Sequence, residues 1–323
     1  MVHSENGAIG LDCFPTPHLA LNSADAGELR RVRRFAEWQV LAAGRAHAVL
    51  SDEWRAFRGR SRRVRALLAA YHELVQWRYG LARAAPSRPG TAVPVDPERF
   101  LAPIDHYGPN CDRIGRVGRL RFNSTWNEDD RVFTGGVSTP AFRITLRYGR
   151  AAQSRFLRSG AAGDILTNSV RLPDGTRIDG NMLVRGAAAR ELARELAARV
   201  AGRGCDTRRF ETGGDPIYVV TAGNSARAEM FRQAMELLAR AGTDDVASWQ
   251  QARFLLYQAP RTKRGSDSVI RTFLVAVGGV LLGAAPRLVH DVDLRCLVLG
   301  QDRATVLPGD PGLEPAPRPS ENS

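Results

Sequence analysis

The chain has 323 residues, of which 43% are hydrophobic and 25% charged. This balance is typical of globular proteins and excludes a wholly disordered or fibrous chain. The formal net charge is +12, and Lys263 is the only lysine among the 46 basic residues. Such an arginine bias, beside many alanines and glycines, is typical of a GC-rich genome and argues against a dedicated nucleic-acid-binding protein.

The cellular compartment is predicted from features that the sequence lacks. The longest apolar run, residues 273–286, is too short to cross a bilayer, and the first residues show no secretory signal. The cysteines lie far apart without a C-x-x-C pair, which argues against a zinc site and a disulfide framework: Cys13, Cys111, Cys205 and Cys296. We expect a soluble cytoplasmic protein without membrane contact, metal or tightly bound cofactor.

The N-terminal part is predicted to be an irregular lead, residues 1–23, followed by a helical extension and linker, residues 24–97. Within it, residues 24–81 read as helix because apolar side chains recur at helical spacing. These side chains are Leu29, Val32, Phe35 and Trp38, then Leu67, Leu68, Tyr71, Leu74 and Val75. A Pro-, Gly- and Ser-rich stretch, residues 85–97, breaks the pattern and predicts the linker.

Arginines crowd the polar faces of this helical extension, in the two groups 30–34 and 58–65. A basic amphipathic helix can lie on a membrane or on RNA. More often such a face is the solvated side of a helical bundle. We keep both interpretations and favour the bundle.

Residues 98–306 are predicted to form one domain of mixed α and β structure. Residues 142–148 alternate between apolar and polar side chains, a period of two that predicts a half-buried strand. The turn residues 172–176 predict a hairpin over 167–178. Two further elements follow, a helix and a short β-branched run: residues 187–200 and 217–221.

The last third is predicted to be helical again and to end in a tail. One helix is stopped by Gly242, and the next runs towards Tyr257. Cap residues are predicted at the start of each helix: Asn224 or Ser225, then Thr243 or Asp244. Residues 307–323 are Pro-rich and polar, which predicts a disordered tail. The whole pattern predicts an α+β fold that is predominantly helical.

The loop over residues 259–267 carries the clearest chemical signal. It contains three cations, a glycine and a good helix cap: Arg261, Lys263, Arg264, Gly265 and Ser266. The helix predicted from Asp267 adds Arg271 one turn later. Free amides at a helix N-terminus and guanidinium groups both bind phosphate oxygens, so we predict a phosphate site here. An ordinary loop between helices is the alternative, because the spacing does not match a P-loop.

Residues Arg264-Gly265-Ser266, after a Pro-containing loop and inside a helix–loop–helix, resemble the Fic/Doc (Fido) superfamily. In that fold two central helices flank an anion-binding loop, and a β-hairpin flap lies over the loop. The common motif H-P-F-x-x-G-N-G-R is absent here, and the similarity is to the AvrB-type branch, which also lacks it. Three further segments match in the same order: Val137–Pro140, Val170–Leu183 with its Gly180-Asn181 pair, and Asp291–Leu294.

The resemblance, over about residues 137–300, implies a Fido-like helical core and a nucleotide-dependent transferase. AvrB-type proteins transfer a deoxyhexose from a nucleotide-diphosphate sugar to a protein threonine. By this resemblance Arg264 and the amides of Gly265 and Ser266 hold the diphosphate, while Asp293 orients a sugar hydroxyl or accepts a proton. Possible substrate contacts are implied at four further positions: Thr139, Arg171, Asn181 and His290.

Other interpretations remain open at the sequence level. Asp293 could cap a turn or pair with Arg295, and His106 has no recognisable catalytic context. His290, near Asp291, could suggest a metal, but ligands so close in sequence cannot readily converge on one ion. The alternative functions are nucleoside monophosphate transfer by a degenerate Fic-type site and a non-catalytic module that binds protein or nucleic acid. The acceptor could be a protein or a small molecule.

Overall fold

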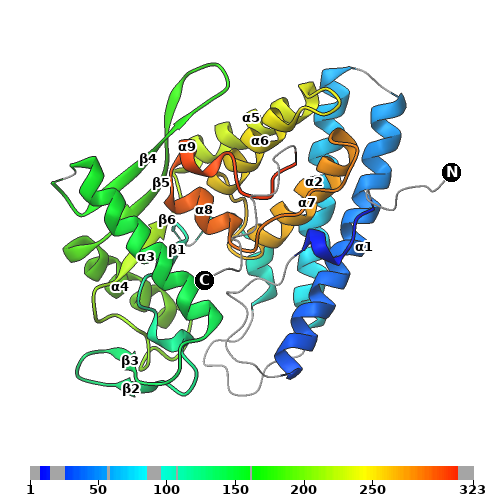
Figure 1. Ribbon diagram of the computed structural model, residues 1–323. Helices are drawn as coiled ribbons and strands as arrows, with labels where there is room; N and C mark the ends of the chain where they lie inside the picture. Colours follow the sequence, from blue (N-terminus) through cyan, green and yellow to red (C-terminus); the bar gives the residue numbers. More distant parts are fainter. Residues whose placement is uncertain are drawn as a thin grey trace, which may run out of the picture.

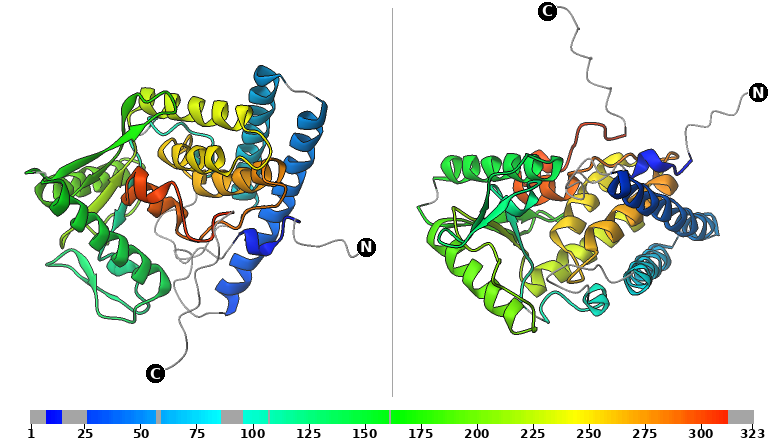
Figure 2. Two further views of the ribbon diagram at one scale, coloured as in Figure 1. Left: turned by 45° about the horizontal axis from the view of Figure 1, so that its top comes forward. Right: turned by 90° about the horizontal axis from the view of Figure 1, so that it is seen from below.

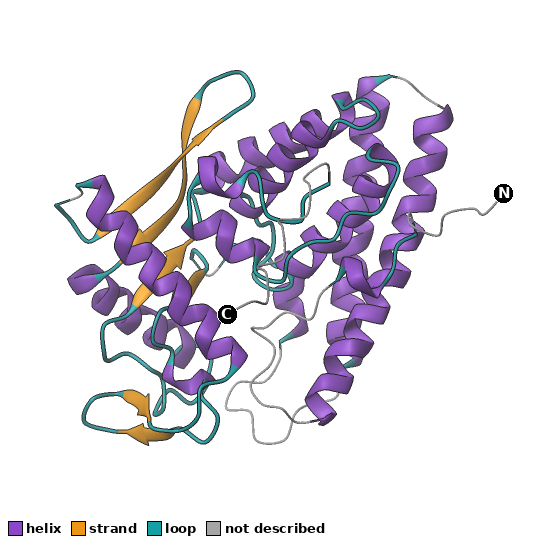
Figure 3. Cartoon of the chain, in the orientation of Figure 1, coloured by secondary structure: helices purple, strands orange, loops and turns teal. Residues whose placement is uncertain are grey.

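The computed structural model describes residues 8–14, 26–56, 59–85, 96–106, 108–160 and 162–311. The fold is α+β and mostly helical, as the sequence predicts. Figure 1 shows a helical part built around α1, α2, α5, α6 and α7 and a second part that contains the sheet, α3 and α4. The strands all lie in that second part, as the colouring by secondary structure in Figure 3 shows for the described residues. Figure 2 shows the same division from two further directions.

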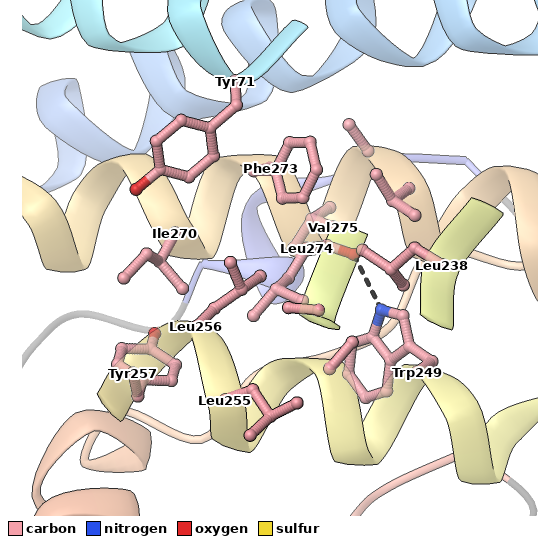
Figure 4. Close-up of a cluster of buried hydrophobic side chains, with 14 of the residues drawn as sticks. Tyr71, Leu238, Trp249, Leu255, Leu256, Tyr257, Ile270, Phe273, Leu274 and Val275 are labelled. Atoms are coloured by element: carbon pink, nitrogen blue, oxygen red, sulfur yellow. Dashed lines mark hydrogen bonds between the residues drawn. The ribbon is translucent and has the colours of Figure 1, made fainter. Parts of the chain in front are cut away.

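The helical part is built around α7 (Ser266–Leu281), whose side chains are buried on almost every face. It packs in one hydrophobic cluster with α1 (Ala26–Ala56), α2 (Arg60–Ala84), α5 (Asn224–Arg240) and α6 (Val246–Gln258). Figure 4 shows part of this core, where the Trp249 indole N–H donates to the carbonyl of Leu274 at 3.1 Å. The segments predicted as an N-terminal extension therefore share a core with the C-terminal helices.

The helix predicted over residues 24–81 is two helices, α1 and α2, and its first apolar stripe is wrong. Leu29 and Trp38 are 47% and 41% exposed, whereas the buried side of α1 is lined mainly by alanines such as Ala43. Small side chains let α1 approach α7 closely. A Cβ built on Gly279 of α7 would lie 2.8 Å from the ring of His47. In α2 the predicted positions are largely buried, with Leu68 exposed: Leu67, Tyr71 and Leu74.

The main sheet has four antiparallel strands in the order β1-β6-β5-β4. Its strands are β1 (Cys111–Ile114), β4 (Ile165–Arg171), β5 (Arg177–Val184) and β6 (Ile217–Val220), and β2 (Thr125–Asn127) pairs with β3 (Val132–Thr134) separately. Helices cover both faces, since Ile217 and Val219 pack with α3 (Pro140–Ser159) and α8 (Val292–Val298), and Tyr218 and Val220 with α4 (Gly186–Ala201). Alternate residues of β6 thus enter two different clusters. The predictions for residues 187–200 and 217–221 are confirmed.

The strand predicted over residues 142–148 is wrong, because these residues lie within α3. Thr139 caps this helix by accepting a hydrogen bond from the backbone N–H of Phe142 at 3.1 Å, and Pro140 occupies its first turn. Tyr148, Ala152 and Phe156 are buried at intervals of four residues. The period of two was therefore an incidental feature of a helix with one apolar face.

The hairpin predicted over residues 167–178 is confirmed by β4 and β5. The backbone N–H of Leu172 donates to the carbonyl of Thr176 at 2.8 Å. Gly175 has φ of +88°, a left-handed conformation that glycine adopts without a steric cost. The turn chemistry that the sequence displays is thus sufficient to position this connection.

Two predicted caps are wrong in position by one or more residues. Gly223 precedes α5, so neither Asn224 nor Ser225 is its cap. Asp245 caps α6, and its carboxylate accepts from the backbone N–H of Ser248 at 3.0 Å. Neither Thr243 nor Asp244 plays that role; Asp244 instead lies in the left-handed region with φ of +62°. Several consecutive cap-forming residues do not reveal which one adopts the required extended backbone.

Residues 8–14 and 307–311 are packed on the fold, although the sequence predicts the segments that contain them to be irregular or disordered. Within the predicted irregular lead, Leu11–Cys13 form a 3-10 helix, and Cys13 and Phe14 are buried. Residues 307–311 of the predicted disordered tail are packed on the fold, while residues 312–323 lie outside the described part. None of the described helices combines the length and apolar character needed to span a lipid bilayer.

A buried ion pair explains why residues 307–311 are packed. Arg253 of α6 is 1% exposed, and its guanidinium pairs with Asp310, whose own side chain is 4% exposed. Asp310 also accepts from the side chain of Gln250 and from the backbone N–H of Leu307, each at 2.8 Å. A fully buried guanidinium requires a counter-charge, which this terminal segment supplies.

We expect Asp310→Ala to lower the free energy of unfolding by about 3–5 kcal/mol, because it leaves the Arg253 charge buried and unpaired. Urea denaturation of the full-length protein measures this change. Asp52→Ala is the control, since it removes an ion pair in which both side chains are at least 75% exposed, and it should change stability far less. Equal midpoints for the Asp310 variant and the wild type would contradict the assigned role.

Candidate functional site

A cavity of about 1000 Å³ lies where the helical part meets the sheet. Its walls come from the loop before α7, the first turn of α7, α4, α8 and the strands β1 and β6. The β4–β5 hairpin, expected as a flap over the loop, contributes no lining residue among the described residues. The strand order explains this outcome, because β1 and β6 border the cavity and β5 and β4 lie further along the sheet.

The loop reaches α7 through Gly265, not through a Ser266 cap. Gly265 is the N-cap residue with φ of +80°, and a Cβ there would lie 2.7 Å from the ring of Phe100. Helix α7 begins at Ser266, one residue earlier than predicted. The Ser266 hydroxyl instead donates to the carbonyl of Thr262 at 3.0 Å and closes the loop on itself. The backbone N–H of Arg264 donates to the backbone carbonyl of Arg99 at 3.0 Å, and this bond connects the loop to the segment that follows residue 97.

The start of α7 faces the cavity, as a phosphate site requires. Gly265, Ser266 and Asp267 all line it. N–H groups in the first turn of a helix have no acceptor within the helix, and they carry the positive end of its dipole. This part of the cavity wall therefore presents backbone donors to an anion.

Three guanidinium groups gather beside these amides without a carboxylate partner. Arg99, Arg203 and Arg264 line the cavity, and none of them forms an ion pair in the described part of the chain. Burial and the charge of Arg203 lower the pKa of Arg264, and burial with the charge of Arg264 lowers the pKa of Arg99. Arg78, behind the loop, has its pKa lowered to about 10 by burial and by Arg264. Cations that repel one another in this way favour a bound anion.

The other predicted cations of the loop have different surroundings. Lys263 lines the cavity, but its ammonium group donates to Gly108 and Asn110, and burial followed by the charge of Arg99 lowers its pKa to about 8. Arg261 stacks on the ring of Phe231 at 4.9 Å and does not line the cavity. The prediction of a phosphate contact at Arg261 therefore finds no support in the geometry.

Arg271 is also outside the cavity lining. Its guanidinium is 4% exposed, pairs with Asp267 at 2.9 Å and donates to the carbonyls of Val289 and His290. These contacts join α7 to the segment that precedes α8. Arg271 therefore positions the carboxylates around it, and no phosphate contact is available to it here.

Carboxylates also line the cavity, and one of them, Asp267, lies in the first turn of α7 itself. Asp293, in the first turn of α8, has its pKa raised to about 7, first by burial and then by the charge of Asp267. The charge of Arg271 opposes this shift from 3.8 Å. The Tyr257 hydroxyl donates to Asp267 at 3.2 Å, and Asp112 of β1 also lines the cavity. A carboxyl group with a pKa raised in this way suits a role in which it accepts a proton.

Asp293 does not pair with Arg295, which was the structural alternative. Arg295 pairs with Asp291 at 3.0 Å, and Asp291 also accepts from Tyr148 at 2.6 Å. The Oδ1 atom of Asp293 is buried and accepts no hydrogen bond within the described ranges. This atom lies 3.8 Å from Nη2 of Arg271, and the Asp293 side chain as a whole is 20% exposed and lines the cavity.

The four predicted substrate contacts do not line this cavity. Thr139 caps α3 and is buried, and Asn181 is a core residue whose amide contacts Asn168 and the carbonyl of Leu297. The backbone carbonyl of His290 accepts from Arg271, and Arg171 lines a separate hollow. Short motifs matched in sequence order carry no information about which side chains face one space.

Other lining residues were missed in the sequence. Arg99 and Arg203 lie in segments for which the sequence predicts no secondary structure or chemical role, and Asp112 comes from a strand that it does not predict. His106, interpreted as structural, also lines the cavity. The arginine excess itself was the only available signal, and it does not separate these residues from the many solvated arginines.

The described residues contain no group of three or more His, Cys, Asp or Glu side chains arranged to hold a metal ion. No protein-family model and no curated protein matches the sequence.

Proposed function

We propose that the protein is a transferase that binds a nucleotide-diphosphate sugar in this cavity and moves the sugar to a hydroxyl group of an acceptor. One observation carries the proposal: guanidinium groups without an ion-pair partner among the described residues share a cavity with Asp293, a carboxyl group whose pKa burial raises to about 7. The first feature suits a diphosphate and the second suits a hydroxylic substrate. The resemblance to AvrB-type proteins, which handle the same class of donor, supports this assignment.

In the proposed reaction the diphosphate lies against Arg264, Arg99 and the amides of Gly265 and Ser266. The acceptor oxygen attacks the anomeric carbon of the sugar, and the bond from this carbon to the diphosphate oxygen breaks. The electron pair remains on the diphosphate, where the guanidinium groups and the helix dipole stabilise the developing charge. The Asp293 carboxylate accepts the proton that the acceptor hydroxyl loses.

A panel of nucleotide sugars and nucleoside triphosphates tests this proposal with the purified full-length protein. We expect release of a nucleoside diphosphate from one of the nucleotide sugars, at a slow rate to water and a faster rate when a hydroxylic acceptor is added. Mass spectrometry of the acceptor then gives the transferred group. Transfer of a nucleoside monophosphate would overturn the proposal in favour of Fic-type chemistry. Polyanion affinity that falls steeply with salt, without turnover, would indicate a binding module.

A further inference from the structure

A second hollow, of about 470 Å³, lies away from the cavity described above. Its arginines come from four elements, α3, β4, β5 and α9 (Gln301–Ala304): Arg155, Arg158, Arg171, Arg177 and Arg303. Asp302 is the only carboxylate that lines it among the described residues. Figure 1 shows α9 beside the base of the β4–β5 hairpin, which brings these distant segments together.

The arginines of this hollow resemble Arg99, Arg203 and Arg264 of the first cavity, because they have no ion-pair partner within the described ranges. None of the five forms an ion pair in the described part of the chain. Burial and the charge of Arg158 lower the pKa of Arg155. Like charges that line one hollow repel one another, most of all where a guanidinium is partly buried, as that of Arg155 is. A bound polyanion would remove this repulsion.

The hollow is a built feature and not a chance gathering of long side chains. The Arg155 guanidinium donates to Asn168 and, at 2.9 Å, to the carbonyl of Val298. Gln301 accepts from the backbone N–H of Arg171 at 2.7 Å and donates to its carbonyl at 2.8 Å. These bonds fix α9 against the edge strand β4 and leave the Arg171 side chain available to a ligand.

We propose that this hollow is a second anion-binding site, for a compact ligand that carries several phosphate groups. The concave shape and the convergence of arginines from four elements favour a small molecule over a nucleic acid, which needs a continuous basic track along its backbone. Several phosphates are needed because the ligand faces five positive charges against one negative charge. This site is independent of the transferase cavity.

Inorganic triphosphate is a suitable probe, titrated by calorimetry at physiological ionic strength. Arg264→Ala serves as the background variant, because it disables the first cavity and leaves only the second. In this background we expect triphosphate to bind at one site. Adding Arg171→Gln and Arg177→Gln together should lower its affinity by about tenfold or more. Both side chains are exposed, so their replacement should leave the fold unchanged.

Arg30→Gln with Arg31→Gln is the matched control, since it removes the same charge from exposed positions on α1. Affinity should stay within about twofold of the background variant. Equal losses in both double variants would overturn the proposal, because they would indicate a general effect of net charge. Absence of triphosphate binding would also overturn it. Binding of single-stranded oligonucleotides would overturn it as well, if their affinity rises with length and depends on Arg171 and Arg177.

Discussion

Replacement of Arg264 with alanine is expected to weaken the binding of a nucleoside diphosphate by about 100-fold or more, which abolishes it under ordinary assay conditions. Arg264 is the lining guanidinium on the loop that leads into α7, and its backbone is fixed by the hydrogen bond from its N–H to Arg99. The substitution removes a fork of donors from a partly buried position, where charged hydrogen bonds are strongest. Calorimetry with uridine diphosphate, guanosine diphosphate and pyrophosphate measures the loss.

The same substitution should not destabilise the unliganded protein. Arg264 lowers the pKa values of Arg78 and Arg99, so its charge opposes theirs in the folded state. Its removal relieves this repulsion, and we expect a melting temperature that is unchanged or higher. Loss of affinity without loss of stability is the signature of a binding residue, because a structural residue would lose both.

Arg261→Ala is the control for this experiment. Arg261 lies three residues earlier in the same loop and carries the same charge, but it stacks on Phe231 outside the cavity. Its replacement should leave the affinity within about twofold of the wild type. An Arg264 variant that binds nucleoside diphosphates as well as the wild type would remove the anion-binding assignment of the loop.

Two features that the sequence predicts correctly are coded by local turn chemistry. The turn over residues 172–176 and the loop before α7 each contain a glycine with positive φ, and both lie where expected. The strand predicted over 142–148 fails because seven residues that alternate also fit one face of a helix. The Thr139-Pro140 start signal decides between them. Local capping chemistry was therefore more informative than periodicity over a short window.

The candidate site was predictable only in its loop, because the other walls depend on long-range packing. Arg99 and Arg203 reach the cavity only after the chain around α4 and the sheet has folded against the helical part. A similar limit applies to Arg253, whose buried charge requires Asp310 from the terminal segment. In an arginine-rich chain the sequence does not show which guanidinium groups come together in one cavity. Only the arrangement in space separates Arg264 from Arg261.

Asp293→Asn is expected to lower turnover by about 100-fold or more while the affinity for a nucleoside diphosphate is retained. Asparagine keeps the size of the side chain but is not a proton acceptor at the attacking hydroxyl. In the wild type, kcat/KM should rise with pH and level off above about 7, because the carboxylate is the active form and the pKa of Asp293 is raised to about 7. Full activity in the variant, or a wild-type profile without this inflection, would deny Asp293 a chemical role.

Stability should respond to the same substitution in the opposite direction from activity. The folded pKa of Asp293 lies above the ordinary value of 3.8, so the folded state retains a proton that the unfolded state releases. The contribution of Asp293 to the free energy of unfolding is therefore fully present below pH 4. It is lost as the pH rises towards 7, at about 1.4 kcal/mol per unit of the pKa difference. Asparagine has no charge to bury and does not lose this contribution. Urea denaturation at pH 5 and pH 8 should therefore show the variant gaining on the wild type at the higher pH, where the wild type is most active.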